Sequence, residues 1–224
     1  MELNKMIDHT KLGANITKAQ IDQLIEEAKT YEFKSVCVNP IWVKYAKHQL
    51  KKSDVLVCTV IGFPHGTHHH LVKAYETLEA INDGADEIDM VINVQALKSK
   101  DYHTVAQEIK GVVENADGRV VKVIIETCYL TNEEIVKACE IAVDQKATFV
   151  KTSTGFGTGG ATVEHVKLMK DTVKEQAYVK ASGGVRTYAD ALKMIEAGAS
   201  RIGTSNGVDI VNKRSEKNDT NTSY

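Results

Sequence analysis

The chain has 224 residues, of which 42% are hydrophobic and 26% charged, and its formal net charge is -2. This composition is ordinary for a globular protein with a sizeable core, and the small charge gives no global attraction for nucleic acid or an anionic membrane. The apolar run 55–63 is among the longest and is interrupted by Thr59, so no membrane span is expected. The first five residues carry acid and base without an apolar stretch, so no secretion signal is expected.

Strand-like and helix-like patterns alternate along the chain. Apolar, β-branched runs predict eight strands at 6–8, 35–38, 55–61, 87–92, 120–125, 148–150, 178–181 and 201–202. Amphipathic stretches with helical spacing separate them, and Thr17 with Gln20 and Thr131 with Glu134 fit capping boxes that open two helices. The pattern predicts a single-domain (β/α)₈ barrel over 1–211, followed by a polar tail at 212–224. An open doubly wound sheet is the alternative, although the first strand is not followed by Gly-x-Gly-x-x-Gly.

Cysteine and histidine usage indicates the compartment and argues against a metal. Cys37, Cys58, Cys128 and Cys139 show no Cys-x-x-Cys spacing and lie in apolar or helical contexts, which predicts reduced thiols and a cytoplasmic protein. Four of the eight histidines crowd the segment 65–70. Successive side chains at a helix start diverge, so a solvated helix start is expected there and no metal or other cofactor is assigned.

Lys151 and Lys180 end two predicted strands in near-identical settings. Each follows an apolar run and begins a turn of serine, threonine or glycine residues, at 150–155 and 179–184. A buried ammonium group must be paired or lose its proton, and two neighbouring ones disfavour each other's charge. This is one route to a neutral, nucleophilic amine and to Schiff-base chemistry. A structural ion pair is the simpler interpretation for either lysine alone, but matching turns on successive strands favour catalysis.

Further charged residues lie inside predicted strands. Alternation places Glu87 and Asp89 on one face, and Asp89 lies nearer the carboxyl end, where it is the better acid–base candidate. Glu87 is equally well explained as a structural partner of a lysine. Lys122, in the next strand, is expected to pair with one of these carboxylates, and Asp8 and Thr10 are expected to join the same polar network.

Two glycine-rich turns, at 182–186 and 202–207, follow the last two strands. Glycine lets backbone N–H groups converge on an anion, and the loops after strands seven and eight of such barrels commonly hold phosphate. The segment 154–156 is a candidate for a third loop lining this phosphate site. The sequence therefore predicts a phosphorylated ligand.

Taken in order, eight segments of the chain resemble deoxyribose-phosphate aldolase, a barrel enzyme that uses a Schiff base. The segments that carry the resemblance are 7–12, 36–40, 60–64, 84–91, 122–127, 151–156, 180–186 and 201–205. The resemblance implies reversible cleavage of 2-deoxy-D-ribose 5-phosphate to acetaldehyde and D-glyceraldehyde 3-phosphate, with no metal. It implies that Lys151 forms the Schiff base, that Lys180 keeps it nucleophilic, and that Asp89 is the acid–base group.

The resemblance also implies substrate contacts. It places Cys37 near the substrate, and the residues matching the phosphate contacts are Gly155, Gly183, Gly184, Gly203 and Ser205. Tyr224 corresponds to a tail tyrosine that reaches the site in some family members. The partners implied are the phosphosugar and the aldehydes, without nucleic acid or membrane; a homodimer is the candidate assembly.

Two other functions remain open from sequence. One is a class I aldolase or transaldolase acting on a different phosphorylated sugar, which substrate profiling would separate. The other is a barrel that binds a phosphosugar without turnover. The presence of both lysines, Asp89 and the glycine turns favours the enzyme.

Overall fold

A closed parallel barrel forms the centre of the computed structural model, which describes residues 2–214. The strands are β1 (Ile7–Lys11), β2 (Ser35–Val38), β3 (Leu56–Ile61), β4 (Glu87–Val91), β5 (Val120–Ile124), β6 (Phe149–Lys151), β7 (Tyr178–Ser182) and β8 (Arg201–Thr204). Each strand pairs with the next, and β1 closes the ring against β8. The predicted (β/α)₈ barrel is therefore confirmed, and the open doubly wound sheet is excluded.

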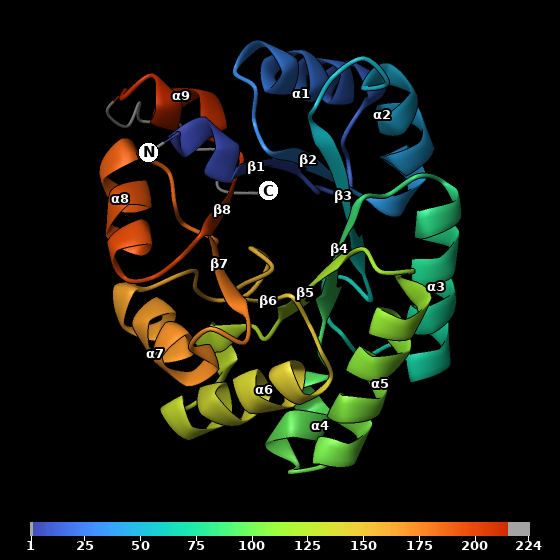
Figure 1. The fold of residues 1–224 in the computed structure, drawn as a ribbon, viewed down its shortest axis with the longest axis vertical. Helices are drawn as coiled ribbons and strands as arrows, with labels where there is room; N and C mark the ends of the chain where they lie inside the picture. Colours follow the sequence, from blue (N-terminus) through green and yellow to red (C-terminus); the bar gives the residue numbers. More distant parts are fainter. Residues whose placement is uncertain (1, 215–224) are drawn as a thin grey trace.

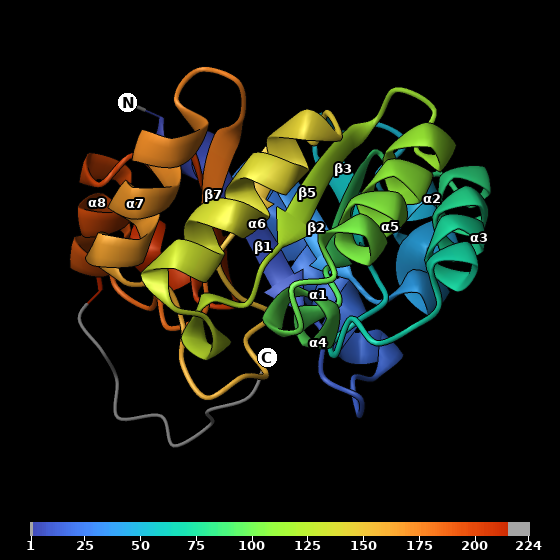
Figure 2. The ribbon, with the colours of Figure 1, turned by 90° about the horizontal axis from the view of Figure 1, so that it is seen from below.

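The helices surround the strands, as Figures 1 and 2 show. They are α1 (Lys18–Thr30), α2 (Val43–Gln49), α3 (His70–Asn82), α4 (Val94–Lys98), α5 (Tyr102–Asn115), α6 (Asn132–Asp144), α7 (Val163–Val173), α8 (Tyr188–Glu196) and α9 (Gly207–Val211). Short 3₁₀ turns occupy Leu3–Met6, Pro40–Trp42 and Thr127–Tyr129. Because the first of these turns takes up Met6, β1 begins one residue later than predicted and runs on to Lys11.

Local sequence signals explain where helices begin. The backbone N–H of Thr131 donates to Glu134 at 2.8 Å, and the Glu134 N–H donates back to the Thr131 hydroxyl at 3.3 Å, which completes the predicted capping box of α6. The Thr17 N–H donates to Gln20 at 2.9 Å at the start of α1.

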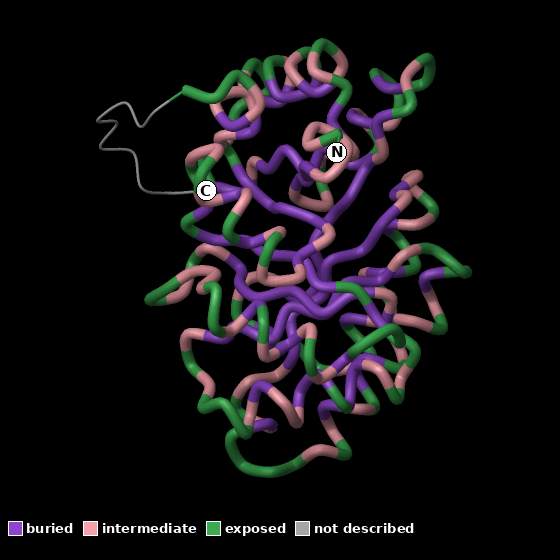
Figure 3. The backbone as a smooth tube through the Cα atoms, turned by 60° about the vertical axis from the view of Figure 1, so that its left-hand side comes forward, coloured by how far each residue is buried: buried purple, intermediate pink, exposed green. Residues whose placement is uncertain are grey.

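Apolar side chains fill the layer between barrel and helices. In β4, Ile88 and Met90 are fully buried and belong to the main hydrophobic cluster, together with helix residues such as Ile109 and Ile135. Figure 3 shows this burial concentrated along the strands. The opposite face of each strand points into the barrel, so alternating residues such as Glu87 and Asp89 are directed inward.

Within residues 2–214, no helix combines the length and the apolar character that crossing a membrane requires. The last described helix, α9, ends at Val211. The tail expected at 212–224 lies almost wholly outside the described residues, so the division of the chain into 1–211 and 212–224 stays a prediction.

Candidate active site

Lysine and aspartate side chains meet inside the barrel. Lys151 is the last residue of β6 and stands beside Lys180 of β7 in the strand register. Asp89 of β4 is paired in the same way with Lys122 of β5. All four residues are buried, and Lys151 keeps 3% exposure. The fold thus brings these four predicted site residues into one cluster.

Asp89 is the centre of this cluster. Its Oδ2 atom lies 2.7 Å from the Lys151 Nζ atom and 2.8 Å from the Lys180 Nζ atom. Its Oδ1 atom lies 2.7 Å from the Lys122 Nζ atom and accepts a 3.1 Å hydrogen bond from the Cys58 thiol. The two lysines that were expected to repel each other directly are therefore joined through one carboxylate oxygen.

A second layer of ion pairs lies toward the amino ends of the strands. The Asp8 carboxylate lies 2.6 Å from both Lys180 Nζ and Arg201 Nη2. The Glu87 carboxylate lies 2.7 Å from Lys122 Nζ and 2.6 Å from Arg201 Nη2. Asp8, Glu87 and Lys122 thus lie in one polar network, whereas the Thr10 hydroxyl turns back to the Asp8 carbonyl at 2.8 Å and stays out of the ionic cluster.

Sequence reasoning missed Arg201, which bridges the two carboxylates of this layer. Arg201 begins β8 and is 6% exposed. Glu87 was selected because it is a charged residue inside a predicted strand, and the same criterion applies to Arg201. The predicted strand at 201–202 was too short to reveal the alternation, because β8 continues to Thr204.

Electrostatic coupling fixes the charge of most of these groups. Burial lowers the pKa of Lys180, but the carboxylates of Asp8 and Asp89 outweigh burial and hold that pKa well above its ordinary value. Burial raises the pKa of Asp89, but the surrounding lysines outweigh it and hold that pKa well below its ordinary value. Lys180 and Asp89 therefore stay charged throughout the neutral range.

The lysines differ in how many carboxylates they contact. Lys122 lies within 4.0 Å of three carboxylates, and Lys180 within 4.0 Å of two. Lys151 pairs with Asp89, and no other carboxylate among residues 2–214 lies within 4.0 Å of its ammonium group. Loss of the Lys151 proton therefore breaks one ion pair, and Asp89 keeps its two other lysine partners.

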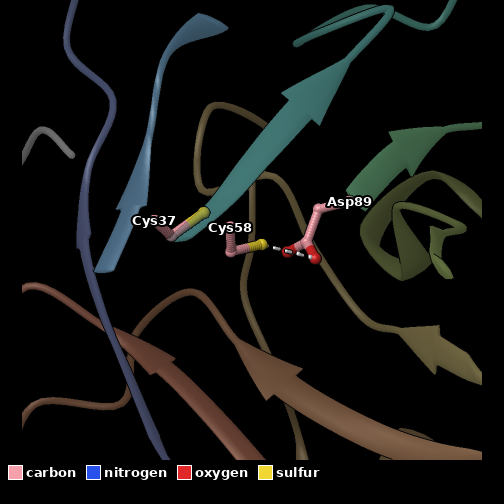
Figure 4. Close-up of side chains that lie close together, drawn as sticks. All are labelled: Cys37, Cys58 and Asp89. Atoms are coloured by element: carbon pink, nitrogen blue, oxygen red, sulfur yellow. Dashed lines mark hydrogen bonds between the residues drawn. The ribbon is translucent and has the colours of Figure 1, made fainter. Parts of the chain in front are cut away.

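Figure 4 shows Cys37, Cys58 and Asp89, which come from neighbouring strands. The register pairs Cys37 with Cys58, and both are fully buried. One ligand atom from each of the three residues lies within 4.8 Å of the others, an arrangement that would suit a soft metal ion. Both Asp89 oxygens already bind lysines, so a metal would have to displace at least one of them. We therefore assign no metal to this group, and the contact of Cys37 with substrate stays a prediction.

Three of the glycines predicted to bind phosphate lie in neighbouring loops after β6 and β7. Gly155, Gly183 and Gly184 have φ angles of 88°, 79° and 77°, which favour glycine. The two loops are in contact, since the Ala161 N–H donates to the Gly183 carbonyl at 2.9 Å. Gly184 is exposed, and apart from its two chain neighbours no described residue has an atom within 4 Å of a Cβ placed on it, so its backbone borders open space.

Gly203 and Ser205 occupy different surroundings at β8. A Cβ on Gly203 would come within 2.9 Å of the Lys180 Cε atom, so this glycine makes room for the lysine. Ser205 is exposed just beyond the strand, and its hydroxyl donates to the Asn206 side chain at 3.2 Å. A phosphate contact at either residue stays a prediction.

Comparison of the chain with known proteins identifies its family. Residues 3–213 match the model of the DeoC/LacD family aldolase. The chain belongs to the DeoC/LacD family of aldolases. A deoxyribose-phosphate aldolase from Macrococcus caseolyticus is 62% identical over 219 residues, covering 98% of this chain and 100% of that protein. One from Carboxydothermus hydrogenoformans is 61% identical over 214 residues, covering 94% of each chain.

A solved structure supports the same assignment. The deoxyribose phosphate aldolase from Aeropyrum pernix superimposes with a TM-score of 0.88 at 33% identity, covering 94% of this chain and 89% of that chain, and it is described as a tetramer. The resemblance predicted from the motifs is therefore confirmed, and the chain is an enzyme of the deoxyribose-phosphate aldolase type.

Two further sequence features of this aldolase are the histidine-rich segment and Tyr224. The histidine-rich segment leads into α3, where His69 accepts a 3.3 Å hydrogen bond from the Leu71 N–H. His65, His68 and His69 are exposed, which confirms the predicted solvated helix start. Tyr224 lies outside the described residues, so its part in the site stays a prediction.

The aldolase also has a cavity of about 290 Å³ between the loops that follow β3, β4, β5 and β6. Glu126, Thr154 and Phe156 are among the residues that line it. Glu126 lies beyond the strand, because β5 ends at Ile124 and Glu126 adopts a left-handed backbone conformation with φ 55°.

Proposed function

We propose that this aldolase cleaves 2-deoxy-D-ribose 5-phosphate reversibly to D-glyceraldehyde 3-phosphate and acetaldehyde through a Schiff base on Lys151. The single observation that carries the mechanism is the arrangement of two lysines on one Asp89 oxygen, at 2.7 and 2.8 Å. Lys180 has a second carboxylate partner, whereas Lys151 has no second one in the part of the chain that the structure describes and lies at the carboxyl end of its strand. These differences favour Lys151 as the nucleophile and Lys180 as the fixed positive charge.

The reaction begins when the neutral Lys151 amine attacks the C1 aldehyde of the open-chain sugar. Water leaves and a protonated imine forms, which accepts electrons. Asp89 is held as a carboxylate by its lysine partners and takes the proton of the C3 hydroxyl, through a water molecule, as the C2–C3 bond breaks. The triose phosphate departs, and the remaining enamine is protonated at C2. Hydrolysis of the resulting imine then releases acetaldehyde and restores the amine.

The glycine loops hold the phosphate in this proposal. Gly155, Gly183 and Gly184 adopt backbone conformations that allow N–H groups to converge on an anion. Gly203 and Ser205 complete the site from β8. Binding the phosphate places C1 of the sugar beside Lys151. The binding energy of the phosphate end is thus used to orient the reacting carbon.

A substrate profile tests the proposed function. Purified enzyme is given 2-deoxyribose 5-phosphate, fructose phosphates and sedoheptulose phosphate, and the released aldehydes are identified and quantified. Cleavage of the deoxy sugar phosphate should far exceed cleavage of the others. Preference for a ketose phosphate would assign another aldolase reaction, and binding without turnover would assign a binding barrel.

We also propose a cytoplasmic role in deoxyribonucleotide breakdown. Cys37, Cys58, Cys128 and Cys139 all carry free thiols, which suits a reducing compartment. The relatives' names supply the deoxyribose phosphate substrate. A homodimer stays the predicted assembly, and light scattering of the full chain would measure it.

A further inference from the structure

Glu126 is a buried carboxylate at the mouth of the barrel, two residues after β5 ends. Its φ and ψ angles are 55° and 65°, a left-handed conformation that non-glycine residues adopt only when surrounding contacts enforce it. Only 3% of the residue is exposed. Both features require specific contacts that hold the side chain.

Those contacts lead to the loop after β6. The Glu126 carboxylate accepts hydrogen bonds from the Thr154 N–H, at 3.1 Å to Oε1 and 3.3 Å to Oε2, and from the Thr154 hydroxyl. The Thr154 hydroxyl oxygen also accepts the Phe156 N–H at 3.0 Å. A Cβ on Gly157 would come within 3.2 Å of the Glu126 carboxyl carbon, so the loop folds closely over this side chain.

The surroundings of Glu126 differ from those of the carboxylates inside the barrel. Among residues 2–214, Glu126 forms no ion pair, and its hydrogen-bond partners are Thr154 and a 3.9 Å contact from the Cys128 thiol. Burial raises its pKa, and the hydrogen bonds from Thr154 oppose that change. The carboxyl group is thus placed to accept hydrogen bonds from a loop, with no described cation within 4.0 Å, although the charge of Lys151 also acts to lower its pKa.

We propose that Glu126 is a positioning residue that holds the loop after β6 so that the Gly155 N–H faces the substrate phosphate. The proposal rests on the proposed function, because it assigns a role in binding the phosphorylated end. Gly155 follows Thr154 directly, and the two loops that would enclose the phosphate meet nearby, where Ala161 bonds to Gly183. Glu126 therefore acts on recognition of the phosphate through Thr154, without contact with the reacting carbons.

The test compares two substrates, 2-deoxyribose 5-phosphate and unphosphorylated 2-deoxyribose, in Glu126→Ala and the wild type. The variant loses the acceptor for Thr154, so KM for the phosphorylated sugar should rise about tenfold while kcat stays within about threefold. The value of kcat/KM for the unphosphorylated sugar should stay within about twofold. An equal loss of kcat on both substrates, or an unchanged KM, would overturn the role.

A conservative variant separates hydrogen bonding from charge. Glu126→Gln keeps an oxygen for the Thr154 N–H and offers its amide N–H to the Thr154 hydroxyl oxygen, so KM should stay within about threefold of the wild type. A Gln variant as impaired as the Ala variant would contradict positioning by hydrogen bonds. Glu114→Ala, which removes an exposed glutamate of α5, is the matched control and should leave both constants unchanged.

Two further results keep the test decisive. If Glu126→Ala fails to fold, Thr154→Val removes the hydroxyl bond from the other side and should raise KM for the phosphorylated sugar about threefold, with an unchanged KM overturning the role. A wild type that does not prefer the phosphorylated sugar overturns the proposed function, and this role with it. A clear wild-type preference with no effect of either variant overturns the Glu126 role alone.

Discussion

The floor and the mouth of the barrel differ in how many oppositely charged partners each charged group has. The floor comprises Asp8, Glu87, Lys122, Lys180 and Arg201, and each of these groups lies within 4.0 Å of at least two groups of opposite charge. At the mouth, Lys151 has one charged partner and Glu126 has none among the described residues. A charge with several partners is fixed in place and in protonation state, whereas a charge with few partners can change either. The proposed nucleophile is therefore the lysine with the sparser ion pairing, and the densely paired groups hold its surroundings in position.

The largest expected effect comes from Lys151→Arg, which keeps a positive charge next to Asp89 but removes the amine that forms the imine. Turnover of 2-deoxyribose 5-phosphate should fall by roughly 10⁴-fold or more. A thermal melt close to that of the wild type would show that the fold is retained. Substantial turnover in this variant would mean that the sparse charge at the mouth is not the nucleophile.

Arg201→Met should produce the largest loss of stability, because it leaves Asp8 and Glu87 buried with fewer partners. We expect the free energy of unfolding to fall by about 3 kcal/mol, the scale seen when one member of a buried ion network is removed. Urea denaturation measures it. Lys167→Met removes an exposed lysine paired with Asp171 at 2.9 Å and is the matched control. Equal losses of unfolding free energy in the two variants would show that the ion pairs of the floor stabilise the fold no more than an exposed ion pair does.

Lys180→Leu should change the pH dependence of the reaction. Lys180 stays charged in the assay range because its pKa is held well above the ordinary value, so its loss removes a positive charge near Lys151. Protonation of the reacting amine then becomes easier, and the acidic limb of the kcat/KM profile should move to higher pH. Activity should fall about tenfold at neutral pH and recover in part at alkaline pH. An acidic limb at the same pH as in the wild type would show that Lys180 does not lower the pKa of the reacting amine.

Glu126→Gln should produce the smallest effect, on stability. Burial raises the pKa of Glu126 above 4.5, so the folded state favours its neutral form. This contribution to stability is present below pH 4.5 and is lost as pH rises through the folded-state pKa. Glutamine does not titrate, so the variant lacks that loss, and its stability relative to the wild type should be greater at pH 7 than at pH 4. Identical stability differences at pH 4 and pH 7 would contradict the assignment.

Much of this arrangement could be predicted from local sequence. Strand alternation placed Glu87, Asp89 and Lys122 inside the barrel, and the glycine turns lie beyond the expected strands. These inferences succeed because the direction of a side chain in a strand depends on its place in a period of two residues. The matching turns after Lys151 and Lys180 likewise indicated one shared site.

The partners of each charge could not be predicted in the same way. Arg201 and Asp8 are 193 residues apart and meet only because β8 closes against β1. The placement of Asp89 between two lysines also depends on barrel closure. Glu126 departs from the strand pattern because it adopts a left-handed backbone conformation. Tertiary contacts enforce this conformation, and the local sequence does not predict it.

Trapping of the Schiff base would identify the nucleophilic lysine. Enzyme is incubated with acetaldehyde, reduced with borohydride and digested, and the modified peptide is identified by mass spectrometry. We expect one ethyl group on Lys151, the lysine with a single carboxylate partner among the described residues. An ethyl group on Lys180 would reverse the roles of the two lysines, and no adduct on either would contradict Schiff-base chemistry in this barrel.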